Sequence, residues 1–196
     1  MVHAVGFHDK KPALLIIDVQ NKFTELTDGL KRSMLGKMET VNGAIDLFRE
    51  RGRPIVYMLF DGMGHLDRDI EEPDSLIPEI RKPLDGEHQV HKTVMNSFHN
   101  TDLESILRNM DCDSIVIVGL VAHLCVAATY YSAYDHGIDP FILKGGIAAT
   151  DEPNVEHVEA ILNHVTMDDL LRELRGKQLP SPHTSTSRGD RDSQLQ

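Results

Sequence analysis

The hydrophobic residues of the chain fall into short continuous runs, and segments with helical spacing of apolar positions lie between them. Runs such as 13–17 and 114–119 are almost wholly apolar, whereas a strand with one solvated face would alternate apolar and polar residues. They therefore predict strands that are covered on both faces, as in a parallel sheet. The predicted strands are 13–17, 54–60, 87–92, 114–119, 140–143 and, as a short sixth, 164–166.

Helices are predicted between these strands, because apolar residues recur there three or four positions apart. The segments are 37–52, 102–110, 123–136, 153–163 and a last one that ends near Gly176. Strands that alternate with helices over the whole length predict a three-layer αβα fold. Its sheet is expected to be doubly wound and mostly parallel, with five to six strands.

Two segments depart from this alternation. Residues 61–86 form a long loop with eight acidic and three basic side chains and, around 75–80, one predicted helical turn. Loops of this length are usually lids, binding loops or disordered. Residues 178–196 are polar and rich in Ser and Thr, which predicts a disordered C-terminal tail after one folded domain at 1–177.

Composition narrows the possible classes of function. The 196 residues carry a net charge of −11, which argues against nucleic acid as a partner, since phosphate binding depends on clustered Lys and Arg. The longest apolar runs are far shorter than the ~20 residues of a membrane span. Residues 1–4 do not resemble the start of a signal peptide, and two cysteines cannot build a disulfide framework. We therefore expect a cytoplasmic protein with no membrane partner, whose cysteines act as thiols.

Three polar residues stand at or just beyond the ends of predicted strands, where open α/β sheets bind their ligands. They are Asp18, Lys92 and Cys125. Each alone has an ordinary structural explanation, as a turn-capping carboxylate, a surface amine and a small buried thiol. Together they supply a general base, a cation and a nucleophile. We expect the start of a helix and the Lys92 ammonium group to lower the pKa of the Cys125 thiol.

The motifs around these residues resemble the isochorismatase-like cysteine hydrolases, a family that includes nicotinamidases, N-carbamoylsarcosine amidase and isochorismatases. The matching segments are Leu14-Leu15-Ile16-Ile17-Asp18-Val19-Gln20-Asn21-Lys22-Phe23, Lys92-Thr93-Val94-Met95-Asn96-Ser97-Phe98 and Gly119-Leu120-Val121-Ala122-His123-Leu124-Cys125-Val126. They occur in the family's order, and the resemblance covers about residues 12–174.

The resemblance implies a Cys-Lys-Asp triad in which Cys125 attacks a carbonyl carbon, Asp18 shuttles the proton and Lys92 stabilises charge. It also implies a non-proline cis peptide at Val121-Ala122, and an oxyanion hole formed by the backbone amides of Ala122 and Cys125. Family geometry would place a small apolar pocket beside the thiol. Its lining residues would be Phe23, Phe60, Asn96, Phe98, His123 and Leu124.

We therefore expect a homo-oligomeric hydrolase, a dimer or tetramer, that cleaves an amide-type C–N bond of a small molecule without a cofactor. Asp61 and His65 resemble a fragment of the metal site of nicotinamidases, but their spacing differs and we expect no metal. Two alternatives stay open. One is an isochorismatase that hydrolyses the enol ether of isochorismate to pyruvate and a dihydroxybenzoate precursor, which does not need the cysteine as a nucleophile. The other is a non-catalytic binding protein on the same fold.

Overall fold

The computed structural model describes residues 6–62 and 70–174. The strands are β1 (Pro12–Ile17), β2 (Ile55–Phe60), β3 (His88–Lys92), β4 (Ser114–Leu120), β5 (Asp139–Ala148) and β6 (His164–Val165). The helices are α1 (Asn21–Thr24), α2 (Asp28–Glu50), α3 (Leu103–Asn109), the π-helix η1 (Ala122–Val126), α4 (Ala127–Asp135), α5 (Glu152–Ile161) and α6 (Met167–Leu174). The strands form one sheet of order β3-β2-β1-β4-β5-β6, and every pairing is parallel.

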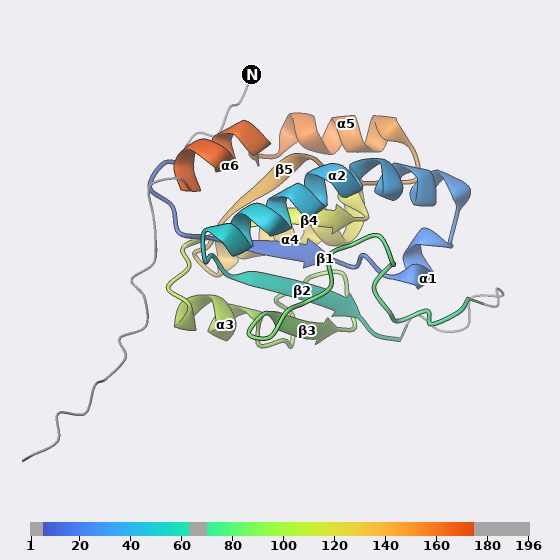
Figure 1. The fold of residues 1–196 in the computed structure, drawn as a ribbon, viewed down its shortest axis with the longest axis horizontal. Helices are drawn as coiled ribbons and strands as arrows, with labels where there is room; N and C mark the ends of the chain where they lie inside the picture. The colour runs from blue at the N-terminus through green and yellow to red at the C-terminus, as the bar shows by residue number, and fades with distance from the viewer. Residues whose placement is uncertain (1–5, 63–69, 175–196) are drawn as a thin grey trace, which may run out of the picture.

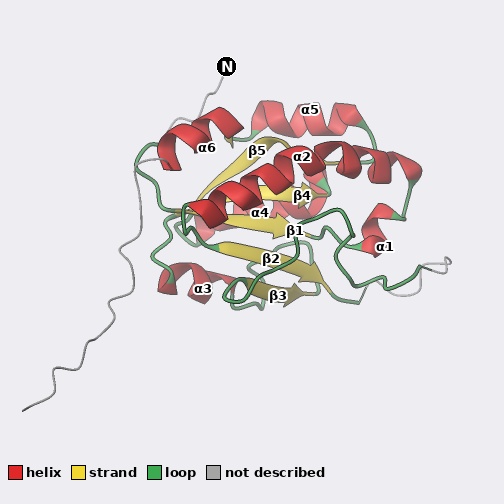
Figure 2. Ribbon diagram, viewed as in Figure 1, coloured by secondary structure: helices red, strands yellow, loops and turns green. Residues whose placement is uncertain are grey.

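The sheet is the middle layer of three. Helices α2 and α6 cover one of its faces, and α4 and α5 cover the other, which confirms the predicted αβα fold (Figure 1). Every residue of the two central strands β1 and β4 is buried, as their continuous apolar sequences predict. The carboxyl ends of the strands point toward α1, and loops crowd this edge of the sheet (Figure 2).

Two elements extend beyond their predicted bounds. Helix α2 begins at Asp28 instead of residue 37, because the Thr27 side chain caps it by accepting a hydrogen bond from the Leu30 amide at 3.0 Å. Strand β5 continues to Ala148 instead of 143, because it pairs with the end of β4 beyond a register shift. Both extensions depend on a contact rather than on an apolar run.

The acidic loop lies against the sheet and α2 over its described part, residues 70–86. In place of the helical turn predicted at 75–80, a hydrogen bond from the Ile80 amide to Ile77 O at 3.4 Å closes a single turn, and Leu76 forms an antiparallel bridge with Gln20. The Asn42 side chain donates to Glu79 O at 2.9 Å and accepts from the Arg81 amide at 2.8 Å. These contacts fix the second half of the loop over α2, because one side chain of the helix binds backbone groups of two loop residues.

The predicted tail at 178–196 lies outside the described residues, and so does the predicted end of the folded domain. Within the described segments, none of the helices combines the length and the apolar character that crossing a membrane requires.

Candidate active site

Asp18, Lys92 and Cys125 meet at the carboxyl edge of the sheet. Asp18 follows β1, Lys92 ends β3, and Cys125 lies in η1, which begins two residues after β4. Lys92 Nζ donates to Asp18 Oδ2 at 2.9 Å, and both side chains are almost completely buried. The Cys125 side chain is also buried and interacts with both of them. The fold thus assembles three chemically complementary groups from distant parts of the chain.

The backbone around Asp18 is held in an uncommon conformation. Its φ angle is +56°, in the left-handed region that residues other than glycine seldom adopt. The Asp18 amide donates to Met58 O at 3.1 Å, and its carbonyl accepts from the Gln20 amide at 2.8 Å. Hydrogen bonds to the neighbouring strand and to the following turn therefore fix the direction of the carboxylate.

Burial dominates the electrostatics of the pair. It raises the pKa of the Asp18 carboxyl, and the positive charge of Lys92 acts against this rise. Lys92 occupies only Oδ2, whereas Asp18 Oδ1 is buried and accepts no hydrogen bond from the described residues. Oδ1 is therefore the oxygen that can receive a proton from a neighbouring group.

The Cys125 thiol is not acidified, contrary to the expectation from sequence. Burial, together with the adjacent Asp18 carboxylate, raises the pKa of the Cys125 thiol to about 12, although Lys92 acts in the opposite direction. The sequence places a lysine and the start of a helix near the thiol, but it does not show how completely the thiol is buried. A protonated thiol needs a base before it can attack.

The segment that carries Cys125 differs from expectation in its backbone. The non-proline cis peptide joins Leu120 and Val121, one bond earlier than the predicted Val121-Ala122. Such a bond is set by tertiary contacts rather than by local residue preference, so the sequence does not distinguish two adjacent peptides. The amides of Leu124 and Val126 donate to Val121 O at 2.9 and 3.3 Å. The amides of Ala122 and Cys125 stay predicted donors of an oxyanion hole.

Of the predicted pocket residues, Phe60 borders the buried pair directly and Phe23 packs against Phe60. The rings of Phe23 and Phe60 pack edge to face at 5.8 Å, and Lys92 Nζ lies 4.7 Å from the centre of the Phe60 ring. His123 and Leu124 are exposed and precede the buried Cys125 in η1. These four residues therefore surround the ends of the strands that carry the candidate catalytic groups.

The other two predicted pocket residues have structural contacts elsewhere. Asn96 Nδ2 donates to Ser132 Oγ at 3.0 Å, and Asn96 Oδ1 accepts from the Phe98 amide at 2.9 Å. The Phe98 ring stacks on the His136 ring at 4.6 Å, at the C-terminal end of α4, whereas Cys125 precedes the N-terminal end of that helix. Asn96 and Phe98 thus join the loop after β3 to α4, and Phe98 lies apart from the thiol.

Of the two candidate metal ligands, only Asp61 lies among the described residues. Asp61 pairs with His91, whose Nδ1 lies 2.9 Å from Asp61 Oδ1, and His65 lies outside the described residues. Among the described residues no three His, Cys, Asp or Glu side chains come together as a metal site would require.

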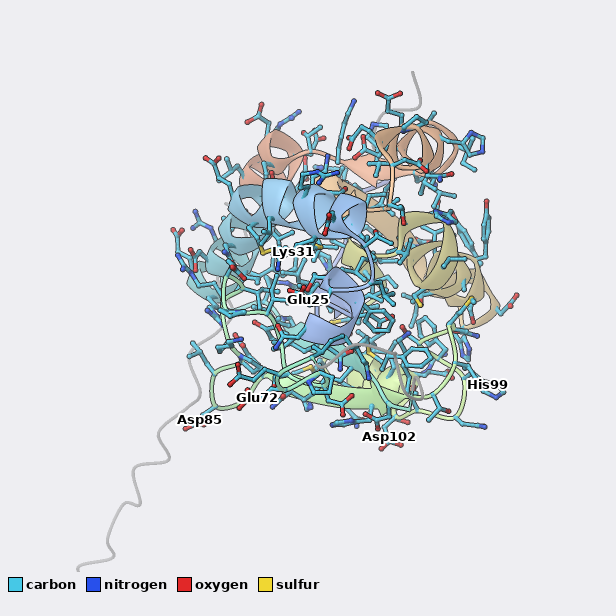
Figure 3. All side chains as sticks on the ribbon, turned by 90° about the vertical axis from the view of Figure 1, so that its right-hand side faces the viewer. Glu25, Lys31, Glu72, Asp85, His99 and Asp102 are labelled. Carbon is cyan, nitrogen blue, oxygen red and sulfur yellow. The ribbon has the colours of Figure 1, made fainter. Side chains whose placement is uncertain are left out.

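A cavity of about 540 Å³ lies beside α1. Its described lining consists of Asn21, Thr24, Glu25, Lys31, Leu35, Ile70, Glu71, Glu72, Ile77, Pro78 and Glu79. Figure 3 looks onto the edge where the strands end, and there Glu25 and Lys31 lie together above Glu72 of the acidic loop. Acidic side chains of the loop thus gather at this cavity, whose described lining does not include the three candidate catalytic residues.

A second buried lysine, Lys22, lies next to the site and was not predicted from the sequence. Its side chain is only 3% exposed, and Nζ lies 5.9 Å from the centre of the Phe60 ring. The one signal available in the sequence is its position four residues after Asp18, within the first motif. A lysine in a polar stretch otherwise indicates a solvated surface.

Comparison with known proteins places the chain in a family. The family model for the isochorismatase domain matches residues 12–167. The chain belongs to the isochorismatase family. This isochorismatase-like hydrolase is 28% identical over 177 residues to the uncharacterized isochorismatase family protein YrdC of Bacillus subtilis, in an alignment that covers 84% of the chain and 90% of YrdC.

Solved structures agree with this assignment. An isochorismatase-like hydrolase from Alkaliphilus metalliredigens is similar with a TM-score of 0.71 and 23% identity, over 83% of this chain and 98% of the other. N-carbamoylsarcosine amidase from Thermoplasma acidophilum is similar with a TM-score of 0.66 and 25% identity, over 80% and 95%. The chain is therefore an isochorismatase-like hydrolase, in a family that includes amidohydrolases.

Proposed function

We propose that the protein hydrolyses an amide-type C–N bond of a small molecule through a thioester on Cys125. The observation that carries this proposal is the buried Lys92–Asp18 pair, with its 2.9 Å hydrogen bond, beside the Cys125 thiol. A role in stability alone is a poor explanation, because a buried ion pair seldom stabilises a fold more than apolar residues of the same size would. A carboxylate, an ammonium group and a thiol in contact are what acyl transfer needs.

In the first half of the reaction, Cys125 Sγ forms a bond to the carbonyl carbon of the substrate while its proton passes to Asp18. Burial favours this transfer, because the Asp18 carboxyl gains its neutral form and Lys92 stays next to the new negative charge. The C–N bond then breaks, and the proton on Asp18 passes to the leaving nitrogen. The amine departs and a thioester remains.

In the second half, a water molecule attacks the thioester carbon and gives a proton to Asp18. The C–S bond breaks, the sulfur of Cys125 recovers that proton from Asp18, and the carboxylic acid product leaves. Asp18 thus accepts and releases one proton in each half of the reaction and is a carboxylate again at the end. Negative charge on the carbonyl oxygen would be stabilised by the amides of Ala122 and Cys125 in both halves.

The direct test is to mix the protein in stoichiometric amounts with a panel of small amides, including nicotinamide and N-carbamoylsarcosine, and to measure its intact mass. We expect wild type to gain the mass of an acyl group with at least one amide. Cys125→Ala should show no adduct and should turn that amide over at least ~10³-fold more slowly, because no other described nucleophile adjoins Asp18. Cys112→Ala, at a buried cysteine before β4, is the matched control and should behave as wild type.

An unchanged turnover in Cys125→Ala would contradict the thioester. If Cys125→Ala also released pyruvate from isochorismate and Asp18→Asn did not, the reaction would be that of an isochorismatase, in which the carboxyl acts without the thiol. Both results are read from the same two variants.

We also propose that the protein acts in the cytoplasm as a homo-oligomer. Four exposed apolar side chains adjoin the site, Val94 and Met95 after β3, Leu124 in η1 and Tyr131 on α4. A hydrogen bond of 3.5 Å from Thr129 of α4 to Met95 O holds the two segments together. A second copy of the chain would cover this apolar surface beside Cys125.

Light scattering after gel filtration tests this proposal. We expect wild type to elute as a dimer or tetramer and Tyr131→Glu to shift toward monomer, because a buried charge opposes association. Ile161→Glu is the matched control, since Ile161 is equally exposed, at 58% against 56% for Tyr131, but lies on α5. A monomeric wild type, or the same shift in both variants, would contradict the assignment of this surface.

A further inference from the structure

Lys22 is a buried cation whose partners come from two other parts of the chain. Its Nζ donates to the backbone carbonyl of Phe60, at the end of β2, and to Asp74 Oδ1 at 2.5 Å, in the acidic loop. Lysine side chains are seldom buried to this extent without a function or a strong partner. Here the partner is weak, because the Asp74 side chain is 72% exposed and water screens its charge.

The acidic loop creates this environment for Lys22. The Lys22 amide donates to Pro73 O at 2.9 Å, the Asn21 amide donates to Ser75 O at 2.9 Å, and Gln20 Nε2 donates to Asp74 O at 2.8 Å. The segment 71–77 therefore lies antiparallel along the turn that follows Asp18. It excludes water from Lys22 and places one carboxylate at its outer side.

The ring of Phe60 links the two buried lysines of the site. Lys92 Nζ lies 4.7 Å and Lys22 Nζ 5.9 Å from the centre of this ring, within the range of cation–π contact. Among the described residues, the buried charges at this edge of the sheet are therefore two ammonium groups and one carboxylate, Asp18. The net charge of these buried groups is positive, because the carboxylate that compensates it, Asp74, faces solvent.

We propose that Lys22 is a positioning residue whose buried charge, which the exposed Asp74 offsets only in part, keeps Asp18 in the ionised form that accepts the proton of Cys125. This inference rests on the proposed function, in which Asp18 is the base. Burial alone would favour a neutral carboxyl, which cannot accept a proton from the thiol. Lys92 must also stabilise the thiolate of Cys125. A second cation that acts on Asp18 but not directly on Cys125 can keep the carboxyl ionised without changing the thiol.

The groups that face Asp18 support this division. Three titratable side chains act on its carboxyl: Lys92 from β3, Cys125 from η1 and Lys22 from α1. Lys22 lowers the pKa of Asp18, whereas the charges that act on the Cys125 thiol are those of Asp18 and Lys92. Removal of Lys22 should therefore change the titration of the base more than that of the nucleophile.

Carbon-13 NMR of the full chain labelled at aspartate Cγ measures this directly and needs no substrate. The Asp18 resonance is identified by its loss in Asp18→Asn, and its midpoint is followed with pH. Lys22→Met should raise the Asp18 midpoint by about 0.5 to 1 pH unit, the effect of one charge at this range in a partly polar interior. Asp74→Asn keeps the accepting oxygen but removes the opposing charge, and should lower the midpoint by about 0.2 unit.

Lys31→Met is the matched control, because Lys31 also pairs with a carboxylate at 2.5 Å, that of Glu25, but is 45% exposed. Its Asp18 midpoint should equal that of wild type. An unchanged or lower midpoint in Lys22→Met would overturn the inference. If Lys22→Met does not fold, Asp74→Asn decides, and a midpoint equal to that of wild type overturns it.

The titration and the adduct experiment can fail independently. A shifted Asp18 midpoint with no acyl adduct on Cys125 would reject the proposed reaction while leaving the charge relation between Lys22 and Asp18 intact. An acyl adduct on Cys125, together with the same Asp18 midpoint in Lys22→Met and wild type, would support the proposed reaction and reject the role of Lys22.

Discussion

Replacement of Asp18 by Asn is expected to abolish amide hydrolysis and at the same time to make the Cys125 thiol more reactive toward iodoacetamide. Hydrolysis should fall by about 10² to 10⁴-fold, the usual contribution of a general base. Alkylation should become faster at pH 8, because the pKa of the thiol, which the Asp18 charge helps to raise to about 12, falls when that charge is removed. Unfolding would also speed alkylation of the buried thiol, and the opposite change expected in Lys92→Met separates the two causes.

The reciprocal change is expected at Lys92. Its charge lowers the pKa of the thiol, so Lys92→Met should slow alkylation at the same pH while also abolishing hydrolysis. In Asp18→Asn the lysine keeps two acceptors, Val94 O and Met95 O at 3.3 Å each, which helps that variant to fold.

The alkylation rates are measured by intact mass in a Cys112→Ala background, so that one thiol reports. Burial raises the pKa of Cys112 to about 11, so we expect it to be a poor nucleophile at pH 8. Slower alkylation in Asp18→Asn than in the background protein would show that the carboxyl activates the resting thiol. The charge of Asp18 would then lower the pKa of the Cys125 thiol instead of raising it, which contradicts the expectation from the structure.

The sequence predicts the sheet better than it predicts what surrounds the sheet. Strands β1, β2 and β4 carry continuous apolar runs, because burial on both faces leaves no position for a polar side chain. The start of α2 contains Gly29 and Gly36, which have low helix propensity, and the Thr27 cap marks its first turn. The short helix α1 was not predicted, since four residues give too little periodicity.

The candidate site, too, could be predicted from the sequence only in part. Asp18, Lys92 and Cys125 could be placed together because they stand at strand ends, and a parallel sheet brings such ends to one edge. The burial that raises the pKa of Cys125 could not be predicted, because it depends on packing around η1. Lys22 is buried by residues 71–77, about fifty positions away, and no local pattern records that contact.

Substitution of Gly119 by Ala is expected to destabilise the protein severely and to displace Asp18, the proposed base. Gly119 has a φ angle of +114°, which residues with a side chain rarely adopt. A Cβ atom there would lie 2.1 Å from Ile17 O and 2.8 Å from Ile17 N, both backbone atoms of the central strand β1. Because Asp18 follows Ile17 directly, any shift that relieves this clash moves the carboxylate.

The clash and the strained backbone together should lower the free energy of unfolding by about 3 kcal/mol or more, since neither neighbour is a flexible side chain. Urea unfolding followed by far-UV circular dichroism measures this, as the chain contains no Trp. Gly36→Ala is the control of opposite sign: Gly36 lies within α2 with nothing within 4 Å of the added Cβ. It should raise stability by about 0.5 to 1 kcal/mol through helix propensity. Unfolding of Gly119→Ala at the same urea concentration as wild type would contradict the close approach of β4 to β1 at Ile17, the residue before Asp18.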